Sequence, residues 1–294
     1  MLVLFLTPAT LLFLIVFLYP VLRTLVMSFY KVEGVTDPIS TWALNGFANY
    51  TQAFADPMFI ASMGNLGKVW LVGGAFVMLM SLMFAVALTS GMRGKKFFRS
   101  IIYLPNLISA VAMGTMWLYF AFAKENFGFL NSIIRFFGGT NIMWTDPAHK
   151  FWSMLIAYCF GMVGYHMLIF MSGIDRIGAD FYEAATIEGA NVFQKFWRIT
   201  LPLLRGSIRT NIVMWTVSSV GFFIWGQVFD PVNLSYQTAL PLNYMYELVF
   251  GSSNASQAVR NSGVGASIGV MMAAIVVTVF AITNFIVKND DVEL

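Results

Sequence analysis

The residues with the most defined chemical pattern lie in one polar stretch between apolar runs, DFYEAATIEGANVFQKFWRITLPL, residues 180–203. Asp180 and Glu183 have the spacing of a capping box. The Asp180 carboxylate would accept from the first free N–H groups of a helix, and Glu183 would favour the positive end of its dipole. Gly189 predicts a stop or bend, and Asn191 predicts the cap of a second short helix.

The chemistry that this stretch offers is docking rather than catalysis. Ala184, Ala185 and Ala190 keep one side of the first predicted helix thin, so another protein could approach its backbone closely. Pro202 predicts the next break in the chain, because proline lacks the N–H that a helix interior needs. The stretch therefore reads as two short helices that present a surface to a partner.

Catalytic constellations are missing from the rest of the sequence. There is one cysteine, Cys159, in a predicted span, and the two histidines, His149 and His166, are expected to be separated by the membrane surface. A single cysteine excludes an internal disulfide. No G-x4-G-K-[ST] run is present, so the chain has no P-loop for ATP, and any ATP-driven work needs another subunit. An intramembrane enzyme would need a nucleophile or metal cluster that we do not find.

The elements that position the polar stretch are predicted to be membrane-spanning helices. The chain has 294 residues, of which 59% are hydrophobic and 11% charged, far from the composition of a soluble domain. Runs long enough to cross a bilayer must be helical, because lipid cannot satisfy an open backbone. The six predicted spans are 2–22, 66–90, 100–123, 151–173, 207–229 and 262–287.

The distribution of lysine and arginine predicts the orientation. Basic residues concentrate in the loop 91–99 and in the loop 174–206, which we therefore place in the cytoplasm with both termini. The loops 23–65, 124–150 and 230–261 then lie outside, and the loop 124–150 is expected to be ordered but too short to be a domain. The first run starts at residue 2 without the basic lead of a signal peptide, so we expect the native start to lie earlier.

The polar stretch resembles the EAA loop of type I ABC importer permeases. Glu183-Ala184-Ala185, three residues, Gly189, nine residues and Ile199-Thr200-Leu201-Pro202 match that pattern at every fixed position. The resemblance implies that residues 181–190 form a coupling helix that docks into a cleft of a separate ATPase subunit. The ATPase-coupling residues are then Glu183, Ala184, Ala185, Gly189, Ile199, Leu201 and Pro202.

Other stretches resemble the carbohydrate branch of that family, the maltose and glycerol-3-phosphate permeases. They are GFANYTQAFADPMF from Gly46 and the third span with Gly114 and Trp117, whereas FDPVNLSYQTALPL stands where the family has G-G-P. The resemblance implies a sugar or related polyol, an external solute-binding protein, a second homologous permease and two ATPase subunits. A heterodimer is expected and a homodimer stays open. The partner ATPase would use ATP and Mg, with no cofactor bound by this chain.

Polar and aromatic residues within the spans are candidates for a substrate path. Tyr165 matches a family position near the path, and the fifth span carries amides and hydroxyls that face protein or water rather than lipid. The candidates are Gly161, Tyr165, Asn211, Trp215 and Ser218. Helix packing and interhelix hydrogen bonds explain these residues about as well.

Three further residues of the spans have roles that packing favours. We expect His166 to be a hydrogen-bonded core residue rather than a ligand. Asn106, beside the helix-bending Pro105, is expected to satisfy backbone groups rather than face a polar pathway. Trp225 is expected in the interfacial aromatic belt.

The predicted spans contain no aspartate or glutamate. Ion-coupled secondary transporters usually need an intramembrane charge, so that class is the alternative function and not the preferred one. The sequence predicts an all-α integral membrane protein with six transmembrane helices and the type I ABC importer permease fold. It would be a single permease domain, residues 1–294, in a bacterial cytoplasmic (inner) membrane.

Overall fold

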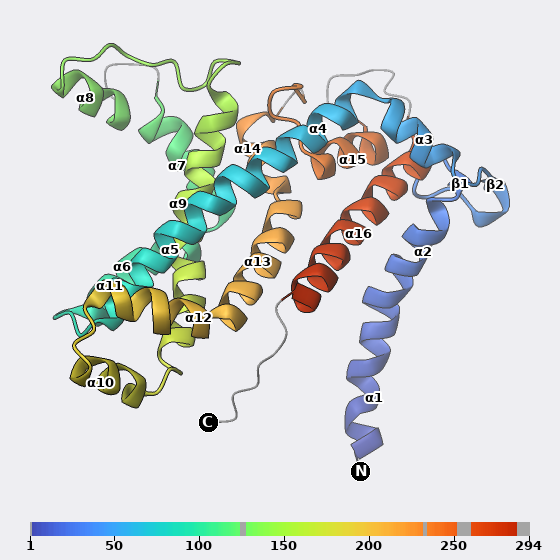
Figure 1. Ribbon diagram of the computed structural model, residues 1–294. Helices are drawn as coiled ribbons and strands as arrows, with labels where there is room; N and C mark the ends of the chain where they lie inside the picture. The colour runs from blue at the N-terminus through green and yellow to red at the C-terminus, as the bar shows by residue number, and fades with distance from the viewer. Residues whose placement is uncertain (1, 124–127, 232–233, 252–259, 287–294) are drawn as a thin grey trace. The chain divides into compact units, whose positions relative to one another are not determined.

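The computed structural model describes residues 2–123, 128–231, 234–251 and 260–286 and is almost entirely helical (Figure 1). Contacts divide the chain into two compact units. Unit 1 comprises residues Met1–Asn65 and Asp230–Ile275, and unit 2 comprises residues Leu66–Phe229 and Val276–Leu294. Both candidate sites considered below lie in unit 2.

Unit 1 joins its helices through a small hairpin. The two strands are antiparallel, with Tyr30 opposite Leu44 and Lys31 opposite Ala43. Its elements are α1 (Leu2–Leu12), the π-helical turn η1 (Phe13–Leu18), α2 (Tyr19–Met27), β1 (Tyr30–Lys31), the 3-10 turn η2 (Ile39–Thr41), β2 (Ala43–Leu44), α3 (Ala48–Ala55), the start of α4 (Pro57–Lys68), α15 (Pro241–Phe250) and most of α16 (Ser262–Ile286).

The GFANYTQAFADPMF stretch links several elements of this unit through hydrogen bonds. Asn49 is buried, and its Nδ2 donates to the carbonyl oxygens of Ser28, at 2.9 Å, and of Tyr30, at 2.8 Å. Asp56 caps α4 by accepting from Met58 N at 2.7 Å, and it also accepts from the Tyr244 hydroxyl of α15 at 2.5 Å. The hydrogen bond to Asp56 and the burial of Tyr244 both raise the pKa of that phenol, with burial the larger cause.

Unit 2 is built around α9 (Lys150–Ile174), which contacts α5, α6, α7, α13 and α14. The remaining elements are η3 (Val69–Gly73), α5 (Gly74–Thr89), α6 (Lys95–Leu107), α7 (Ala110–Met116), η4 (Trp117–Ala121), α8 (Phe129–Phe136), α10 (Ala179–Ile187), α11 (Val192–Lys195), η5 (Phe196–Thr200), α12 (Leu201–Leu203), α13 (Arg205–Val220) and α14 (Phe223–Phe229).

Close packing between α9 and α6 depends on one glycine. A Cβ added at Gly164 would lie 2.3 Å from the carbonyl oxygen of Ile102 and 2.6 Å from the Cα of Tyr103. No side chain fits at this point, so the two backbones touch. By contrast, Gly161, one turn earlier on α9, has no atom within 4 Å of an added Cβ.

Helices that could cross a membrane fall on all six predicted apolar runs. In the described residues four are uninterrupted, Leu6–Met27, Pro57–Thr89, Lys150–Ile174 and Ser262–Ile286, and two are bent pairs. The pair Arg205–Val220 and Phe223–Phe229 bends by 43°. The pair Lys95–Leu107 and Ala110–Ala121 bends by 97°, so the span predicted over 100–123, which Pro105 was expected to bend, consists of two helices at a steep angle.

The sharp bend has a local cause. Pro105 has no N–H to donate, α6 ends at Leu107, and Ile108 is extended. Ser109 then caps α7 by accepting from Ala112 N at 3.3 Å. The helical backbone hydrogen bonds of α6 thus end, and those of α7 begin, within two residues.

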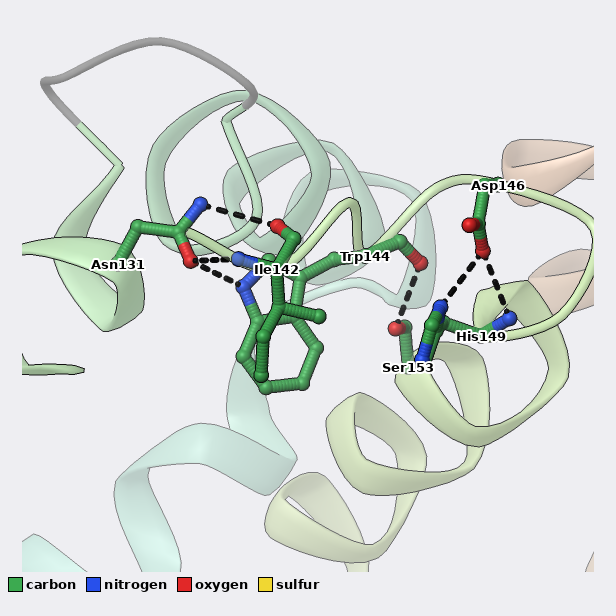
Figure 2. A network of polar contacts seen from close by, with 6 residues as sticks. All are labelled: Asn131, Ile142, Trp144, Asp146, His149 and Ser153. Atoms are coloured by element: carbon green, nitrogen blue, oxygen red, sulfur yellow. Dashed lines mark hydrogen bonds and ion pairs between the residues drawn. The ribbon is translucent and has the colours of Figure 1, made fainter. Parts of the chain in front are cut away.

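A polar network orders the segment between α8 and α9 (Figure 2). The buried Asn131 of α8 accepts from Ile142 N at 3.0 Å and from Trp144 Nε1 at 3.1 Å, and its Nδ2 donates to Ile142 O at 3.1 Å. Ser153 of α9 donates to Trp144 O at 2.8 Å. The described part of this predicted outer loop is therefore anchored at both ends by hydrogen bonds.

The end of the same segment carries a hydrogen-bonded pair of side chains, Asp146 and His149. Asp146 Oδ1 lies 2.7 Å from His149 Nδ1 and accepts from His149 N at 2.9 Å, just before α9 begins (Figure 2). The side-chain hydrogen bond to His149 lowers the pKa of Asp146. The carboxylate thus caps the entry into the central helix.

Candidate functional site

The polar stretch begins with α10, but not in the predicted way. The helix starts at Ala179, its N-cap is Gly178, and no side chain caps it. Asp180 already lies inside the first turn, where it complements the helix dipole without bonding to the free N–H groups. The predicted capping box of Asp180 and Glu183 is therefore absent, because the turn that enters the helix falls at the glycine.

The end of α10 is a Schellman motif centred on Gly189. Gly189 has a left-handed backbone with φ of 78°, its N–H donates to Thr186 O at 3.0 Å, and Ala190 N donates to Ala185 O at 2.8 Å. The predicted stop at Gly189 is confirmed. Space is not the constraint there, because no atom lies within 4 Å of an added Cβ, so the glycine serves the backbone conformation alone.

The second short helix starts at the predicted cap. Asn191 Oδ1 accepts from Gln194 N at 2.8 Å, and Gln194 Oε1 accepts from Asn191 N at 2.8 Å, which completes a capping box. The helix continues through η5 and α12, and the break falls at Leu204 instead of Pro202. In the π-helical turn, Leu201 N donates to Phe196 O. The pattern of backbone hydrogen bonds therefore changes just before Pro202, which has no N–H to donate.

The two short helices are tied to each other by side chains. The Tyr182 hydroxyl of α10 lies 3.0 Å from Thr200 Oγ1 of η5, and Lys195 Nζ donates to Thr186 Oγ1 at 2.7 Å. Thr200 precedes α12 and α13 directly in the chain. The side-chain contacts therefore link α10 to the segment that leads into α13.

The surface around Gly189 is apolar and open. Ile187, Val192 and Phe193, close to Gly189 in the chain, expose 88%, 81% and 70% of their surface. We call these three residues the apolar shoulder. Among the predicted coupling residues, Glu183, Ala184 and Gly189 are exposed as well, whereas Ala185, Ile199, Leu201 and Pro202 are half-buried and support the helices.

Two of the candidate path residues, Asn211 and Trp215, are buried and lie in one cluster with His166. His166 Nδ1 lies 2.7 Å from Asn211 Oδ1, and Asn211 Nδ2 donates to Ser207 O at 3.0 Å. Because that amide oxygen only accepts, His166 carries its proton on Nδ1. Both side chains are fully buried, in keeping with the expected hydrogen-bonded histidine.

Trp215 packs beside this pair and crosses to η3 and α5. Its Nε1 donates to Trp70 O at 2.9 Å, and Trp70 Nε1 donates to Thr216 Oγ1 at 2.9 Å. A Cβ added at Gly74 would lie 2.6 Å from Trp215 Nε1. The indole therefore occupies the space that the glycine leaves.

The other candidates lie apart from this pair of hydrogen-bonded side chains. Tyr165 and Ser218 are half-buried, and the ring of Tyr165 meets that of His166 edge-on at 5.2 Å. Gly161 accepts a hydrogen bond from Asn106 Nδ2 at 3.2 Å, so Asn106 bonds to the backbone of α9, not to its own helix. His166 thus contacts both Asn211 and Trp215, whereas Gly161 and Ser218 do not belong to this cluster.

Trp225 also differs from its expected place. It is 7% exposed, and its ring stacks on Phe222 at 6.3 Å and meets Tyr158 at 5.7 Å. Because α13 and α14 bend at residues 221–222, the aromatic side chain turns into unit 2 and is not part of a surface belt. Reasoning from sequence also missed Trp70 and Gly74, whose roles depend on a contact far along the chain.

Comparison with known proteins places this geometry in a family. Residues 78–289 match the family model described as "Binding-protein-dependent transport system inner membrane component". The arabinooligosaccharides transport system permease protein AraP of Bacillus subtilis is 27% identical over 95% of this chain and 86% of its own length. The lactose transport system permease protein LacF of Rhizobium radiobacter is 30% identical over 84% of this chain and 82% of its own length.

The fold is also found among solved structures. A chain of the bacterial alginate ABC transporter, solved in complex with alginate pentasaccharide-bound periplasmic protein, superposes with a TM-score of 0.78 at 21% identity, covering 97% of this chain and 92% of that one. The family match spans the polar stretch 180–203, α9 and α13, the elements described above. The chain therefore belongs to the family of inner membrane components of binding-protein-dependent transport systems.

Proposed function

We propose that the protein is the permease subunit of an ATP-driven ABC importer that moves an oligosaccharide or a related polyol across the bacterial inner membrane. The observation that carries the proposal is the coupling segment, residues 180–203: two short helices set at an angle by Gly189 and tied together by side chains, with the apolar shoulder at their junction. Such a surface suits a protein cleft better than water. As a permease the chain is a transport component and not an enzyme.

The substrate class rests on the relatives. AraP and LacF are named for arabinooligosaccharides and lactose, and the structural neighbour imports alginate. The buried aromatic side chains of α9, α13 and α14 are compatible with a path for sugars, whose C–H faces pack on aromatic rings. Tyr165, which is only half-buried, is the member of this group best placed to meet such a substrate.

The partners follow from the same assignment. We propose a second homologous permease that completes the translocation path, two ATPase subunits that use ATP and Mg, and an external solute-binding protein. The coupling segment and both termini would lie in the cytoplasm, as the positive-inside rule predicts. Glu183 would pair with a basic residue of the ATPase cleft.

The geometry suggests how ATP closure would move the helices. Closure of the ATPase dimer displaces α10 at the apolar shoulder, and the contact of Tyr182 with Thr200 transmits the displacement to α12 and α13. Since α13 packs against α9, the helices of unit 2 would rock together and expose the path to the outside. In this proposal α10 moves together with α12 and α13 as one rigid unit.

The test is ATP-dependent sugar uptake and ATPase co-purification in the complete complex. Gly189→Val should abolish both, because a β-branched residue cannot adopt the left-handed backbone of the Schellman motif. Gly189→Asn is the matched control, since asparagine tolerates that conformation and should retain most activity. Uptake that persists in Gly189→Val, or that follows an ion gradient without the ATPase, would refute the proposal.

A further inference from the structure

One side of α8 is apolar and exposed. Phe129, Ile133 and Phe136 follow one another at intervals of four and three residues, so they lie on the same side of this helix. All three are exposed, Phe136 to 85%, and Phe137, directly after the helix, is exposed to 81%. Ser132 is the only exposed polar residue of α8. We call the four apolar residues together the α8 face.

The opposite side of α8 is polar and points into the protein. Asn131 is buried, and its amide bonds to Ile142 and to the indole of Trp144 (Figure 2). A surface helix in water normally has the reverse arrangement, with its apolar side buried and its polar side exposed. The orientation that Asn131 fixes therefore suits a helix whose outer surroundings are apolar.

The α8 face continues the surface of a predicted membrane span. The ring of Phe129 stacks on that of Phe120, with centroids 6.0 Å apart and planes at 13°. Phe120 belongs to η4, near the end of the span predicted over 100–123, and both Phe120 and its neighbour Tyr119 are exposed. Helix α8 contacts η4 and lies off to one side of α9 (Figure 1). The α8 face thus begins at the level where the span ends, which is where aromatic side chains meet lipid headgroups.

We propose that α8 is an interfacial helix and that the α8 face lies among lipids, at the boundary between headgroups and acyl chains. The stack of Phe129 on Phe120 sets the depth of its first turn, and Asn131 determines which side faces the lipid. Apolar area removed from water would hold the helix there. With the orientation of the proposed function, the leaflet is the outer one.

A solute-binding protein fits the α8 face less well than lipid does. A carrier that delivers a sugar must leave again, and each departure would return Phe136 and Phe137 to water. Lipid covers both side chains at all times. Contact with lipid does not depend on transport, so this proposal and the proposed function fail separately.

Quenching of a fluorescent label tests the contact with lipid. The complete complex, with Cys159→Ser and Phe136→Cys in this chain, is labelled with nitrobenzoxadiazole and placed in nanodiscs of phosphatidylglycerol and phosphatidylethanolamine. Lipids with a nitroxide near the headgroup should remove most of the fluorescence, whereas iodide in the water should remove little. The same label on Thr140→Cys, exposed beyond α8, is the control and should respond to iodide instead.

Two results with the Phe136→Cys label would overturn the proposal. Quenching by iodide and not by the nitroxide lipids would place the α8 face in water, and protection on adding the solute-binding protein would then assign the face to that protein. Shielding from both quenchers would show that another subunit of the complex covers it.

A second set of variants tests whether the α8 face itself determines the depth of the helix. With the label on Ser132→Cys, Phe136→Asp with Phe137→Asp should replace quenching by lipid with quenching by iodide, because carboxylates avoid hydrocarbon. Phe136→Tyr with Phe137→Trp keeps aromatic rings suited to the interface and should retain quenching by lipid. Both pairs change exposed side chains and leave the hydrogen bonds of Asn131 intact. Lipid quenching that persists in the acidic pair would overturn the proposal.

Discussion

At the scale of single residues, unit 2 uses polar side chains to fix how helices meet. His166 and Asn211 have no surface exposure, yet each has a hydrogen-bond partner across α9 and α13. In a membrane the unfolded alternative also finds partners, so such bonds contribute only about 1 kcal/mol each. Their main effect is to specify one register of the two helices.

The first prediction concerns this pair. Asn211→Leu leaves the Nδ1–H of His166 buried without an acceptor and should destabilise the protein by about 1–3 kcal/mol. His166→Phe combined with Asn211→Leu removes both polar groups and should recover part of that loss. Thermal unfolding of the wild type, Asn211→Leu, His166→Phe and the double variant in detergent measures the coupling, and a double variant as unstable as the sum of the two single variants would contradict it.

At the scale of elements, the contact between α9 and α6 gives the sharpest prediction. Gly164→Ala places a methyl group against the backbone at Ile102 and Tyr103, which cannot shift as a side chain could. The resulting overpacking should cost about 1–3 kcal/mol and lower the unfolding temperature. Gly161→Ala, on the same helix, meets open space and serves as the control. Equal unfolding temperatures for the two variants would show that α6 moves freely.

The same scale shows what the sequence could predict. The stop at Gly189 and the cap at Asn191 were predictable because each depends on bonds within a few residues. Helices on the six apolar runs were predictable because span length and hydropathy decide them. The break at Leu204, two residues past Pro202, was not predictable from sequence, because a π-helical turn before the proline lets the helix continue past the missing backbone hydrogen bond.

Long-range contacts account for the other differences. Trp225 turns inward because the bend after α13 carries it toward Tyr158, and Asn49 is buried because two distant carbonyl groups need its amide. Neither contact leaves a local pattern in the sequence. The 97° bend between α6 and α7 has one signal in the sequence, Pro105. A proline predicts a kink but not the angle of the kink.

At the scale of the whole molecule, the function requires that the coupling segment and the segment after α8 lie on opposite sides of the membrane. The charge distribution predicts this, with the basic loops 91–99 and 174–206 inside. The chain offers a clean way to test it, because Cys159 is its single cysteine and is buried in α9. Cys159→Ser therefore gives a background for single labels.

In that background Thr140→Cys, which is exposed in the segment after α8, should react with a membrane-impermeant maleimide added to intact spheroplasts. Val192→Cys, on the apolar shoulder, should react only in inside-out vesicles. Its labelling should also rise several-fold when the ATPase subunits are stripped away, because docking buries the shoulder. Labelling of Val192→Cys from the outside would reverse the topology, and labelling that ignores the ATPase would mean that the partner docks elsewhere.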